Sequence, residues 1–224
     1  MPHELIIFDL DGTLADTVPG IAHAAATVLE ELGLPAPDPA AVRAGIGGGA
    51  RNLMTSLLGA AHASRLDEAL AKFSAYYNAH AELHTELYPG VQEFLGTLHP
   101  GVRLAVATAK TRPGTMRIFE HAGIAGCFDA IVTMTEMRAP KPDPGCVRDI
   151  LELLEVPAGK ALYVGDTMTD VLTAENAGVD YAIVSYGYGA EQVRRLRPEA
   201  RFIDDFGQLI AHSPQHESAN GDGS

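Results

Sequence analysis

The stretch IIFDLDGTLADT, Ile6–Thr17, poses the question that decides the fold: why does a short apolar run end in two aspartates? Asp9 and Asp11 are separated by one residue, and Gly12-Thr13 follow at once. Two unit charges ~4 Å apart repel by roughly 4 kcal/mol at an effective dielectric constant near 20. A bound cation is the simplest way to offset this repulsion, so the stretch predicts a metal site at the end of a buried strand.

The composition limits what the protein can bind. With 224 residues, 46% hydrophobic and 20% charged, the chain can bury the core of one large domain or two small ones. Its net charge of −13 disfavours nucleic-acid binding, which depends on contacts of Lys and Arg with phosphate. An anionic substrate must therefore be attracted locally, by a metal ion or by a few placed cations. The lysines are Lys72, Lys110, Lys141 and Lys160.

Cysteine usage and hydropathy bear on the compartment. Cys127 and Cys146 lack the spacing of a metal site, and two cysteines in a chain of this length indicate a reduced, cytoplasmic setting. No apolar stretch approaches the length of a membrane-spanning helix. The first apolar run has no basic region before it and ends in acids, unlike a signal peptide. We therefore expect a cytoplasmic protein that binds neither membranes nor nucleic acids.

Short apolar runs predict the strands of a buried parallel sheet, because they are continuous rather than alternating. These runs are Leu5–Phe8, Val102–Thr108, Ala130–Met134, Ala161–Val164, Ala182–Ser185 and Arg201–Ile203. Apolar residues at three- and four-residue spacing predict helices between them, with Gly123 and Gly178 as terminating glycines. The predicted helices are Val91–Leu98, Arg112–Ala122, Pro144–Leu154 and Met168–Ala177. The alternation predicts an α/β fold with a doubly wound parallel (Rossmann-like) sheet.

The alternation breaks between Ala15 and Glu86, where we find helical patterns and no strand. The helical stretches there are Gly20–Leu32, Pro39–Ala44, Arg51–Leu58 and Ala63–Leu83. We expect a core of residues 1–14 and 89–212 with an all-helical insert at 15–88, the Tyr88-Pro89-Gly90 turn returning the chain to the sheet. The tail, residues 213–224, is rich in Ser, Gly, Asn and Asp and is predicted to be disordered.

Polar residues follow four of the predicted strands, at the end where open α/β sheets bind ligands. In chain order they are Asp9 with Asp11, Thr108 in LAVATAK, Lys141 in APKPDP, and Asp166 with Asp170 in YVGDTMTD. The carboxyl ends of parallel strands meet at one edge of a sheet, so these side chains are expected to converge.

This set of side chains suits phosphoryl transfer. Asp9 can attack phosphorus to form an aspartyl-phosphate, which splits a slow hydrolysis into two easier steps. Mg²⁺ would neutralise the repelling anions, held by Asp9, Asp166 and a backbone carbonyl. Lys141 would supply a fixed cation and Thr108 a hydroxyl donor to the phosphoryl oxygens. Asp11 is placed to protonate the leaving oxygen and then to activate water.

Each of these residues also has a structural alternative. Asp11-Gly12 could form a hairpin turn, although no alternating second strand follows. Thr108 could be an ordinary strand threonine, and Lys141 a solvated surface lysine. Asp166 and Asp170 could cap the helix that follows them. The coincidence of all four sites at strand ends favours the catalytic interpretation.

The motifs resemble those of the haloacid dehalogenase superfamily of phosphohydrolases over nearly the whole chain. Asp9-Leu10-Asp11-Gly12-Thr13 is similar to its first motif, Thr108 to the second, and Lys141 to the third. Gly165-Asp166-Thr167 with Asp170 is similar to the fourth, and the insert resembles the small four-helix cap of that superfamily. The details DTVPG, YPGV, KPDP and SYGYG look most like the phosphoglycolate phosphatase branch.

The resemblance implies roles for the motif residues. Asp9 would be nucleophile and metal ligand, and Asp11 the general acid/base, with its carbonyl as a second ligand. Asp166 would be a third ligand, and Asp170 would support the metal and Lys141 indirectly. The implied activity is that of a Mg²⁺-dependent phosphatase for a small phosphorylated metabolite, as a monomer or homodimer.

Departures from other branches narrow the choice. Dehalogenases of this group lack the second aspartate, Asp11. Phosphonate hydrolases need a lysine from the cap, and Lys72 is far from the expected position. The β-phosphoglucomutase branch has a histidine ten residues after the acid/base aspartate, where this chain has Ile21. Ala109 argues the other way, since the residue after the second-motif threonine is usually asparagine in phosphoglycolate phosphatases.

The segment AGIGGGAR, Ala44–Arg51, clusters glycines between two predicted helices of the insert. No strand precedes it, so it is not a dinucleotide fingerprint. It is either a flexible connection or a loop that faces the active site, where its N–H groups and Arg51 would contact the leaving group. The expected substrate contacts are Thr17, Gly47, Gly48, Arg51, Arg43, Ala109 and Lys110.

Other features of the insert have simpler interpretations. His80 and His84, four residues apart, could bind a metal, but cationic side chains are also favoured near a helix C-terminus. Tyr76 and Tyr77 are interpreted as packing residues. A signalling receiver module is the non-enzyme alternative, although it should be shorter and lack a helical insert. On the same scaffold, pyrophosphatase, nucleotidase and sugar-phosphate phosphatase or mutase activities stay open.

Overall fold

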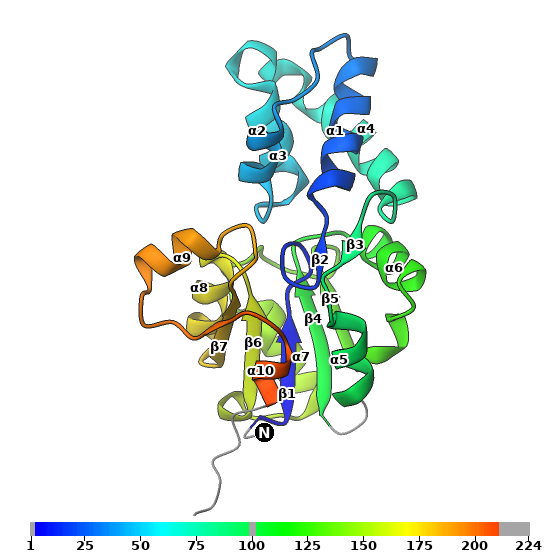
Figure 1. The fold of residues 1–224 in the computed structure, drawn as a ribbon. Coiled ribbons are helices and arrows are strands. Elements are labelled where there is room, and N and C mark those ends of the chain that lie inside the picture. The colour runs from blue at the N-terminus through cyan, green and yellow to red at the C-terminus, as the bar shows by residue number, and fades with distance from the viewer. Residues whose placement is uncertain (1–2, 99–101, 211–224) are drawn as a thin grey trace, which may run out of the picture.

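The computed structural model describes residues 3–98 and 102–210, and the tail predicted to be disordered lies outside these residues. A six-stranded parallel sheet lies at the centre, in the order β5-β4-β1-β6-β7-β8 (Figure 1). Its strands are β1 (Leu5–Phe8), β4 (Arg103–Thr108), β5 (Ala130–Thr133), β6 (Ala161–Gly165), β7 (Asp180–Val184) and β8 (Phe202–Ile203). Each lies within two residues of its predicted range, so the doubly wound parallel sheet is confirmed.

The strand order places β1 at the switch point of the sheet. Phe8, the last residue of β1, is paired with Val106 of β4 on one side and with Val164 of β6 on the other. From β1 the sheet is extended in one direction by β4 and β5 and in the other by β6, β7 and β8. Ligands of open α/β sheets bind where the order reverses in this way, beyond the carboxyl ends of the strands.

Helices cover both faces of the sheet, which is why β1 is apolar throughout. Ile6 and Phe8 belong to one buried cluster, while Leu5 and Ile7 belong to a second cluster on the opposite face. The covering helices are α5 (Val91–Leu98), α6 (Arg112–His121), α7 (Gly145–Leu154), α8 (Met168–Ala177), α9 (Ala190–Leu196) and α10 (Gly207–Ile210). Short 3₁₀ turns lie at η2 (Ala125–Cys127) and η3 (Ala158–Lys160).

The insert is helical and lies beyond the carboxyl edge of the sheet (Figure 1). It comprises α1 (Val18–Glu31), α2 (Pro39–Gly45), α3 (Gly49–Leu58), the 3₁₀ turn η1 (Ala60–Arg65) and α4 (Leu66–His80), together called the cap below. Met54 and Phe73 are buried between its helices. The helix predicted over 63–83 is shorter, because a 3₁₀ turn precedes it and a turn follows His80.

The expectation that no strand occurs between Ala15 and Glu86 is wrong at both ends of the insert. β2 (Ala15–Asp16) and β3 (Glu86–Leu87) form a short antiparallel pair where the chain leaves and re-enters the core. Tyr88 N also donates to Leu14 O at 3.0 Å. Two residues are too few to show an alternating pattern, so this pair arises from tertiary proximity alone. No helix in the described part of the chain is both long and apolar enough to cross a bilayer.

Candidate active site

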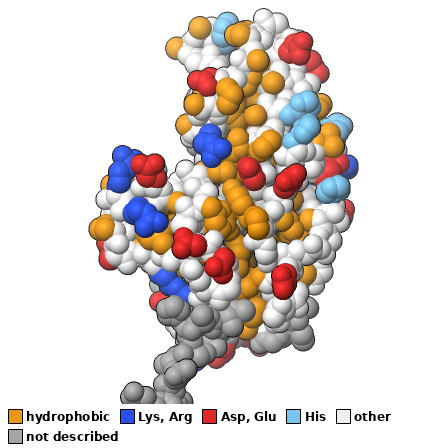
Figure 2. Space-filling model, viewed as in Figure 1, with side chains coloured by type: hydrophobic (Ala, Val, Ile, Leu, Met, Phe, Trp, Pro, Cys, Tyr) orange, Lys and Arg blue, Asp and Glu red, His pale blue; other side chains and the backbone are white. Residues whose placement is uncertain are grey.

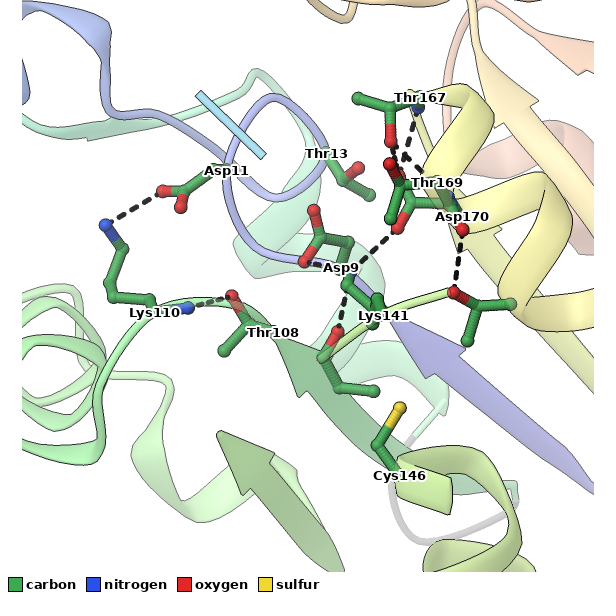
Figure 3. Close-up of polar contacts among 12 residues, drawn as sticks. Asp9, Asp11, Thr13, Thr108, Lys110, Lys141, Cys146, Thr167, Thr169 and Asp170 are labelled. Atoms are coloured by element: carbon green, nitrogen blue, oxygen red, sulfur yellow. Dashed lines mark hydrogen bonds and ion pairs between the residues drawn. The ribbon is translucent and has the colours of Figure 1, made fainter. Parts of the chain in front are cut away.

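The site begins with Lys141, whose ammonium lies between two buried carboxylates (Figure 3). Lys141 Nζ is 3.0 Å from Asp9 Oδ1 and 2.7 Å from Asp170 Oδ1. It also donates to Ala107 O at 3.2 Å and to Tyr163 Oη at 3.0 Å. The Lys141 side chain is only 3% exposed, so its interpretation as a solvated surface lysine is wrong.

Three carboxylates from two strand ends converge at the same place. Asp9, Asp166 and Asp170 are all buried, and each offers an oxygen within 4.8 Å of the oxygens of the other two. Asp9 Oδ1 accepts no hydrogen bond, because Lys141 approaches it as an ion pair outside hydrogen-bond geometry. A buried carboxylate oxygen without a donor, within a set of hard oxygen ligands, fits a divalent cation such as Mg²⁺.

The pKa values of the carboxyl groups also fit a cation. Burial raises the pKa of Asp9 to about 7, with Lys141 opposing the shift and the charge of Asp170 adding to it. Burial, and then the charges of Asp170 and Asp9, raise the pKa of Asp166 well above its usual range. Burial also acts against the Asp170 carboxylate, but Lys141 holds its pKa below the usual value. A cation next to Asp9 and Asp166 would stabilise their charged forms against both burial and repulsion.

Asp166 is held in a tight backbone cradle. Its Oδ2 accepts hydrogen bonds from Tyr188 N at 2.7 Å and Gly189 N at 3.3 Å. A Cβ atom added at Gly187 would lie 2.2 Å from Asp166 Cβ and 2.8 Å from Gly12 O. The chain can therefore pass this close to Asp166 only with glycine at position 187, within the SYGYG segment.

Replacing Gly187 with alanine is expected to displace Asp166 and to lower activity by about tenfold or more. The added methyl group would overpack a backbone contact, which typically costs about 1–3 kcal/mol of stability. Steady-state kinetics and urea unfolding of Gly187→Ala measure the two effects. Gly96→Ala is the matched control, because a Cβ atom there meets nothing within 4 Å. Wild-type activity in Gly187→Ala would contradict the importance of the cradle.

Asp170 serves both as a helix cap and as a partner of Lys141. Thr167 is the N-cap of α8, and its hydroxyl and backbone N–H donate to Asp170 Oδ2 at 2.6 and 3.0 Å. Asp170 Oδ1 accepts from Lys141 and from Tyr163. The capping alternative is thus correct for Asp170, whereas Asp166 turns away from the helix toward Tyr188 and Gly189.

Thr108 ends β4 beside β1 and is fully buried. Its Oγ1 accepts a hydrogen bond from Lys110 N at 3.2 Å, which leaves its own proton available for a further acceptor. The position at the carboxyl edge, next to the strand that leads into Asp9, agrees with the predicted placement.

Asp11 contacts two residues that the sequence assigned to substrate. Lys110 Nζ lies 3.0 Å from Asp11 Oδ1 (Figure 3). Thr17 Oγ1 donates to the same oxygen at 2.6 Å. Lys110 Nζ also donates to Tyr77 Oη, on α4 of the cap, at 2.8 Å. Burial alone would lower the pKa of Lys110, but the charge of Asp11 and the contact with Tyr77 raise it above its usual value, so the side chain is an ammonium.

Tyr77 is therefore more than the packing residue that the sequence predicted. Lys110 lies 33 positions away along the chain, so no local sequence pattern predicts its contact with Tyr77. Arg43 also differs from expectation, because its guanidinium lies over the Tyr188 ring, 5.3 Å from the centroid, and it does not line the cavity described next.

A cavity of about 260 Å³ separates the cap from the core next to Asp11. It is lined by the predicted contacts Gly47, Gly48, Arg51, Ala109 and Lys110. Most of the remaining wall is apolar and includes Ile21, Ile46, Leu53, Leu70, Phe73 and Met134. The glycine-rich segment thus faces the site, in agreement with the second of its two interpretations.

Histidine side chains gather on one flank of the cap (Figure 2). His80 stacks on Tyr76 with ring centroids 4.6 Å apart, and His84 packs against His23 at 5.0 Å. Within residues 3–98 and 102–210, the acidic or histidine group arranged to hold a metal is the aspartate triad, and it contains neither His80 nor His84. His80 lies in the last turn of α4, where the sequence favoured a helix-end role.

The fold and the site together define a class: α/β enzymes with carboxylates and a lysine at the switch point of a parallel sheet, beneath a helical cap. Comparison with family models agrees. The model described as haloacid dehalogenase-like hydrolase matches residues 6–184, and the chain belongs to this family. It is therefore a hydrolase, which removes the signalling receiver alternative.

Individual relatives cover almost the whole chain. A phosphoglycolate phosphatase of Rhodospirillum rubrum is 38% identical over 91% of this chain and 88% of its own length. A phosphoglycolate phosphatase of Pseudomonas syringae pv. tomato is 38% identical over 92% of this chain and 78% of its own length.

Solved structures share the fold. A protein of Haemophilus somnus, described as a predicted phosphoglycolate phosphatase, is superposed with a TM-score of 0.85 at 27% identity, covering 94% of this chain and 97% of that one. A haloacid dehalogenase-like family hydrolase of Streptococcus pneumoniae gives a TM-score of 0.80 at 25% identity, covering 94% and 98%.

Proposed function

We propose that the chain is a Mg²⁺-dependent phosphatase that hydrolyses a small phosphomonoester through an aspartyl-phosphate on Asp9. The observation that carries this proposal is the placement of the buried Asp9 carboxylate against Lys141, two residues before Asp11 at the wall of the cavity. Family membership and the names of the relatives support phosphate ester chemistry.

In the first half of the reaction, a carboxylate oxygen of Asp9 attacks phosphorus and the bond from phosphorus to the leaving oxygen breaks. Asp11 gives its proton to that oxygen, so the product leaves as a neutral alcohol. Lys141 and the Thr108 hydroxyl face the charge that develops on the phosphoryl oxygens. In the second half, Asp11 removes a proton from water, which attacks phosphorus and releases phosphate from Asp9.

The carboxylates of Asp9 and Asp166 and the backbone carbonyl of Asp11 would hold Mg²⁺, with Asp170 acting indirectly through its neighbours. When bound, Mg²⁺ supplies the positive charge that lets a carboxylate approach a phosphate. Asp9 Oδ1, which accepts no hydrogen bond, and the raised pKa values of Asp9 and Asp166 support this assignment.

Phosphoglycolate is the substrate that we propose. Two relatives described as phosphoglycolate phosphatases are 38% identical to the chain, and Arg51 in the cavity wall is a cation available to a carboxylate. Residues 15–88 would act as the cap that selects the leaving group, and residues 1–14 with 89–212 as the catalytic core. Free thiols at Cys127 and Cys146 suit a cytoplasmic setting, in which we propose that the protein acts as a monomer or homodimer.

A substrate panel tests the proposal. Phosphate release from phosphoglycolate, pyrophosphate, nucleoside monophosphates and sugar phosphates is compared by kcat/KM, with Mg²⁺ and after treatment with a chelator. The expected result is the highest kcat/KM for phosphoglycolate and loss of turnover in chelator, restored by Mg²⁺. Preference for another member of the panel would replace the substrate, and turnover unaffected by chelation would overturn the metal assignment.

Replacing Arg51 with alanine is expected to raise KM for phosphoglycolate by about tenfold, the factor that 1.4 kcal/mol of binding energy represents. Arg51 lines the cavity, and its guanidinium is 3.2 Å from Asp67 and largely exposed, so it can turn toward a bound carboxylate. KM for p-nitrophenyl phosphate, which lacks a carboxylate, should stay unchanged. Arg65→Ala is the control on the same cap, since Arg65 does not line the cavity. An equal change for both substrates would show that Arg51 does not meet the carboxylate.

A further inference from the structure

We propose that Tyr77 is a positioning residue that acts through Lys110: from the cap, it holds the Lys110 ammonium against Asp11. The inference rests on the proposed function, in which Asp11 moves the proton. The further point is that the orientation of the Asp11 carboxylate depends on a side chain of the cap. Lys110 then serves the carboxylate of Asp11, in contrast to its predicted role as a substrate contact.

The contacts around Lys110 form a chain from the cap to Asp11. The Lys110 side chain is 5% exposed. Its Nζ donates to Tyr77 Oη at 2.8 Å and lies 3.0 Å from Asp11 Oδ1. The backbone of Lys110 is held as well, because its N–H donates to Thr108 Oγ1. A buried ammonium held at both ends has few alternative rotamers, so its position depends on both partners.

These contacts leave one oxygen of Asp11 for chemistry. Thr17 and Lys110 both contact Oδ1, and within the described residues no hydrogen bond or ion pair reaches Oδ2. Asp11 also lines the cavity, where the leaving group would lie. Fixing Oδ1 at two points therefore orients Oδ2, the oxygen from which a proton can pass to the leaving oxygen as its bond to phosphorus breaks.

Tyr77 is itself rigid and belongs to a seam between α4 and the core. Its ring stacks on Phe73 with centroids 5.6 Å apart, and the residue is 5% exposed. Along the same seam, Thr111 Oγ1 donates to Asn78 Oδ1 at 2.5 Å. Arg117 of α6 then makes two bonds to Glu82, at 2.6 and 2.7 Å. Docking of α4 thus brings the Tyr77 hydroxyl to Lys110, and separation of the seam would remove it.

The test uses the full-length protein as wild type, Tyr77→Phe, Lys110→Met and the double variant. Phe keeps the ring and removes only the hydroxyl, while Met keeps much of the length of lysine without its charge. The value of kcat/KM is measured with p-nitrophenyl phosphate and with the alkyl phosphate that the substrate panel ranks first. Tyr76→Phe is the matched control, because Tyr76 is the next residue on the same helix and contacts His23, away from Lys110.

We expect Tyr77→Phe to lower kcat/KM for the alkyl phosphate by about tenfold, since small misplacements of a catalytic group can cost up to about 10²-fold. The loss with p-nitrophenyl phosphate should stay below about threefold, because p-nitrophenolate leaves without needing a proton. The double variant should match Lys110→Met alone, since Tyr77 acts through Lys110. Tyr76→Phe should match wild type.

An equal loss with both substrates, no loss in Tyr77→Phe, or additive effects in the double variant would each overturn the inference. Thermal unfolding of every variant identifies a change in stability, and if Tyr77→Phe fails to fold, the substrate dependence of Lys110→Met decides. Turnover by the Asp9→Asn variant would instead overturn the proposed function. The two failures are therefore distinguishable.

Discussion

Replacing Asp9 with asparagine is expected to lower kcat by at least about 10³-fold, the scale of loss on removing a catalytic nucleophile. Asparagine has nearly the same shape as aspartate, but its amide cannot form the acyl-phosphate bond. Its loss of charge also removes a ligand from the aspartate triad. Single-turnover assays that trap phosphoprotein should detect label on the wild type and none on Asp9→Asn. Turnover within tenfold of wild type would exclude Asp9 as nucleophile.

The same substitution is expected to raise the unfolding temperature of the metal-free protein at pH 8. Because burial raises the pKa of Asp9 from 3.8 to about 7, the folded state binds this proton more tightly than the unfolded state. The resulting destabilisation is absent below pH 3.8, grows as the pH rises toward 7, and is complete above it. Asparagine carries no charge at any pH and removes this cost.

The gain is measured by thermal unfolding in chelator at pH 5 and pH 8. It should be larger at pH 8, with about 2–4 °C for each kcal/mol of relieved destabilisation in a domain of this size. Asp149→Asn is the control, since Asp149 lies exposed on α7. A lower unfolding temperature in Asp9→Asn at pH 8 would show that the ion pair with Lys141 stabilises the protein more than burial of the Asp9 charge destabilises it.

Replacing Lys141 with methionine is the second large change, and it should reduce both activity and stability. Lys141 Nζ pairs with Asp9 and Asp170, so its loss leaves two buried carboxylates without their cation. Removing one partner of a buried ion pair typically destabilises by about 3–5 kcal/mol. We expect kcat to fall by about 10²–10³-fold, because the fixed charge that faces the phosphoryl oxygens disappears.

Urea unfolding and steady-state kinetics check both parts of this prediction. Lys160→Met is the matched control, because Lys160 is half exposed and lies 3.5 Å from Glu4, at the opposite end of β6. Lys141→Arg should not restore activity, since a planar guanidinium does not fit the space of an ammonium that contacts four groups. A stable, active Lys141→Met protein would contradict the proposed role.

The sheet was predictable because its strands are covered on both faces and therefore consist of unbroken apolar runs. The positions of Asp9, Lys141 and Asp166 followed from one topological rule, that the carboxyl ends of parallel strands meet at a common edge. Neither inference needs knowledge of how distant helices pack. The glycine-rich segment had two interpretations from the sequence, a flexible connection or a loop that faces the site, and the structure places it in the cavity wall.

The features that escaped prediction all depend on contacts between the cap and the core. Tyr77 looks like any apolar-facing aromatic on a helix, and only the docking of α4 brings it to Lys110. Arg43 was a plausible substrate contact by charge, yet it packs on the Tyr188 ring. A sequence records which side chains can interact, whereas the relative placement of two packed units decides which of them do.

The pairing of β2 with β3 has a consequence for how such an enzyme can change over generations. The chain leaves the core and returns to it through two dipeptides that pair with each other. The insert is therefore attached to the core as one closed loop. Under the proposed function, mutations among residues 18–85 can therefore change recognition of the leaving group without altering the register of any core strand. Tyr77 is the exception, because its contact with Lys110 ties the insert to Asp11 in the core.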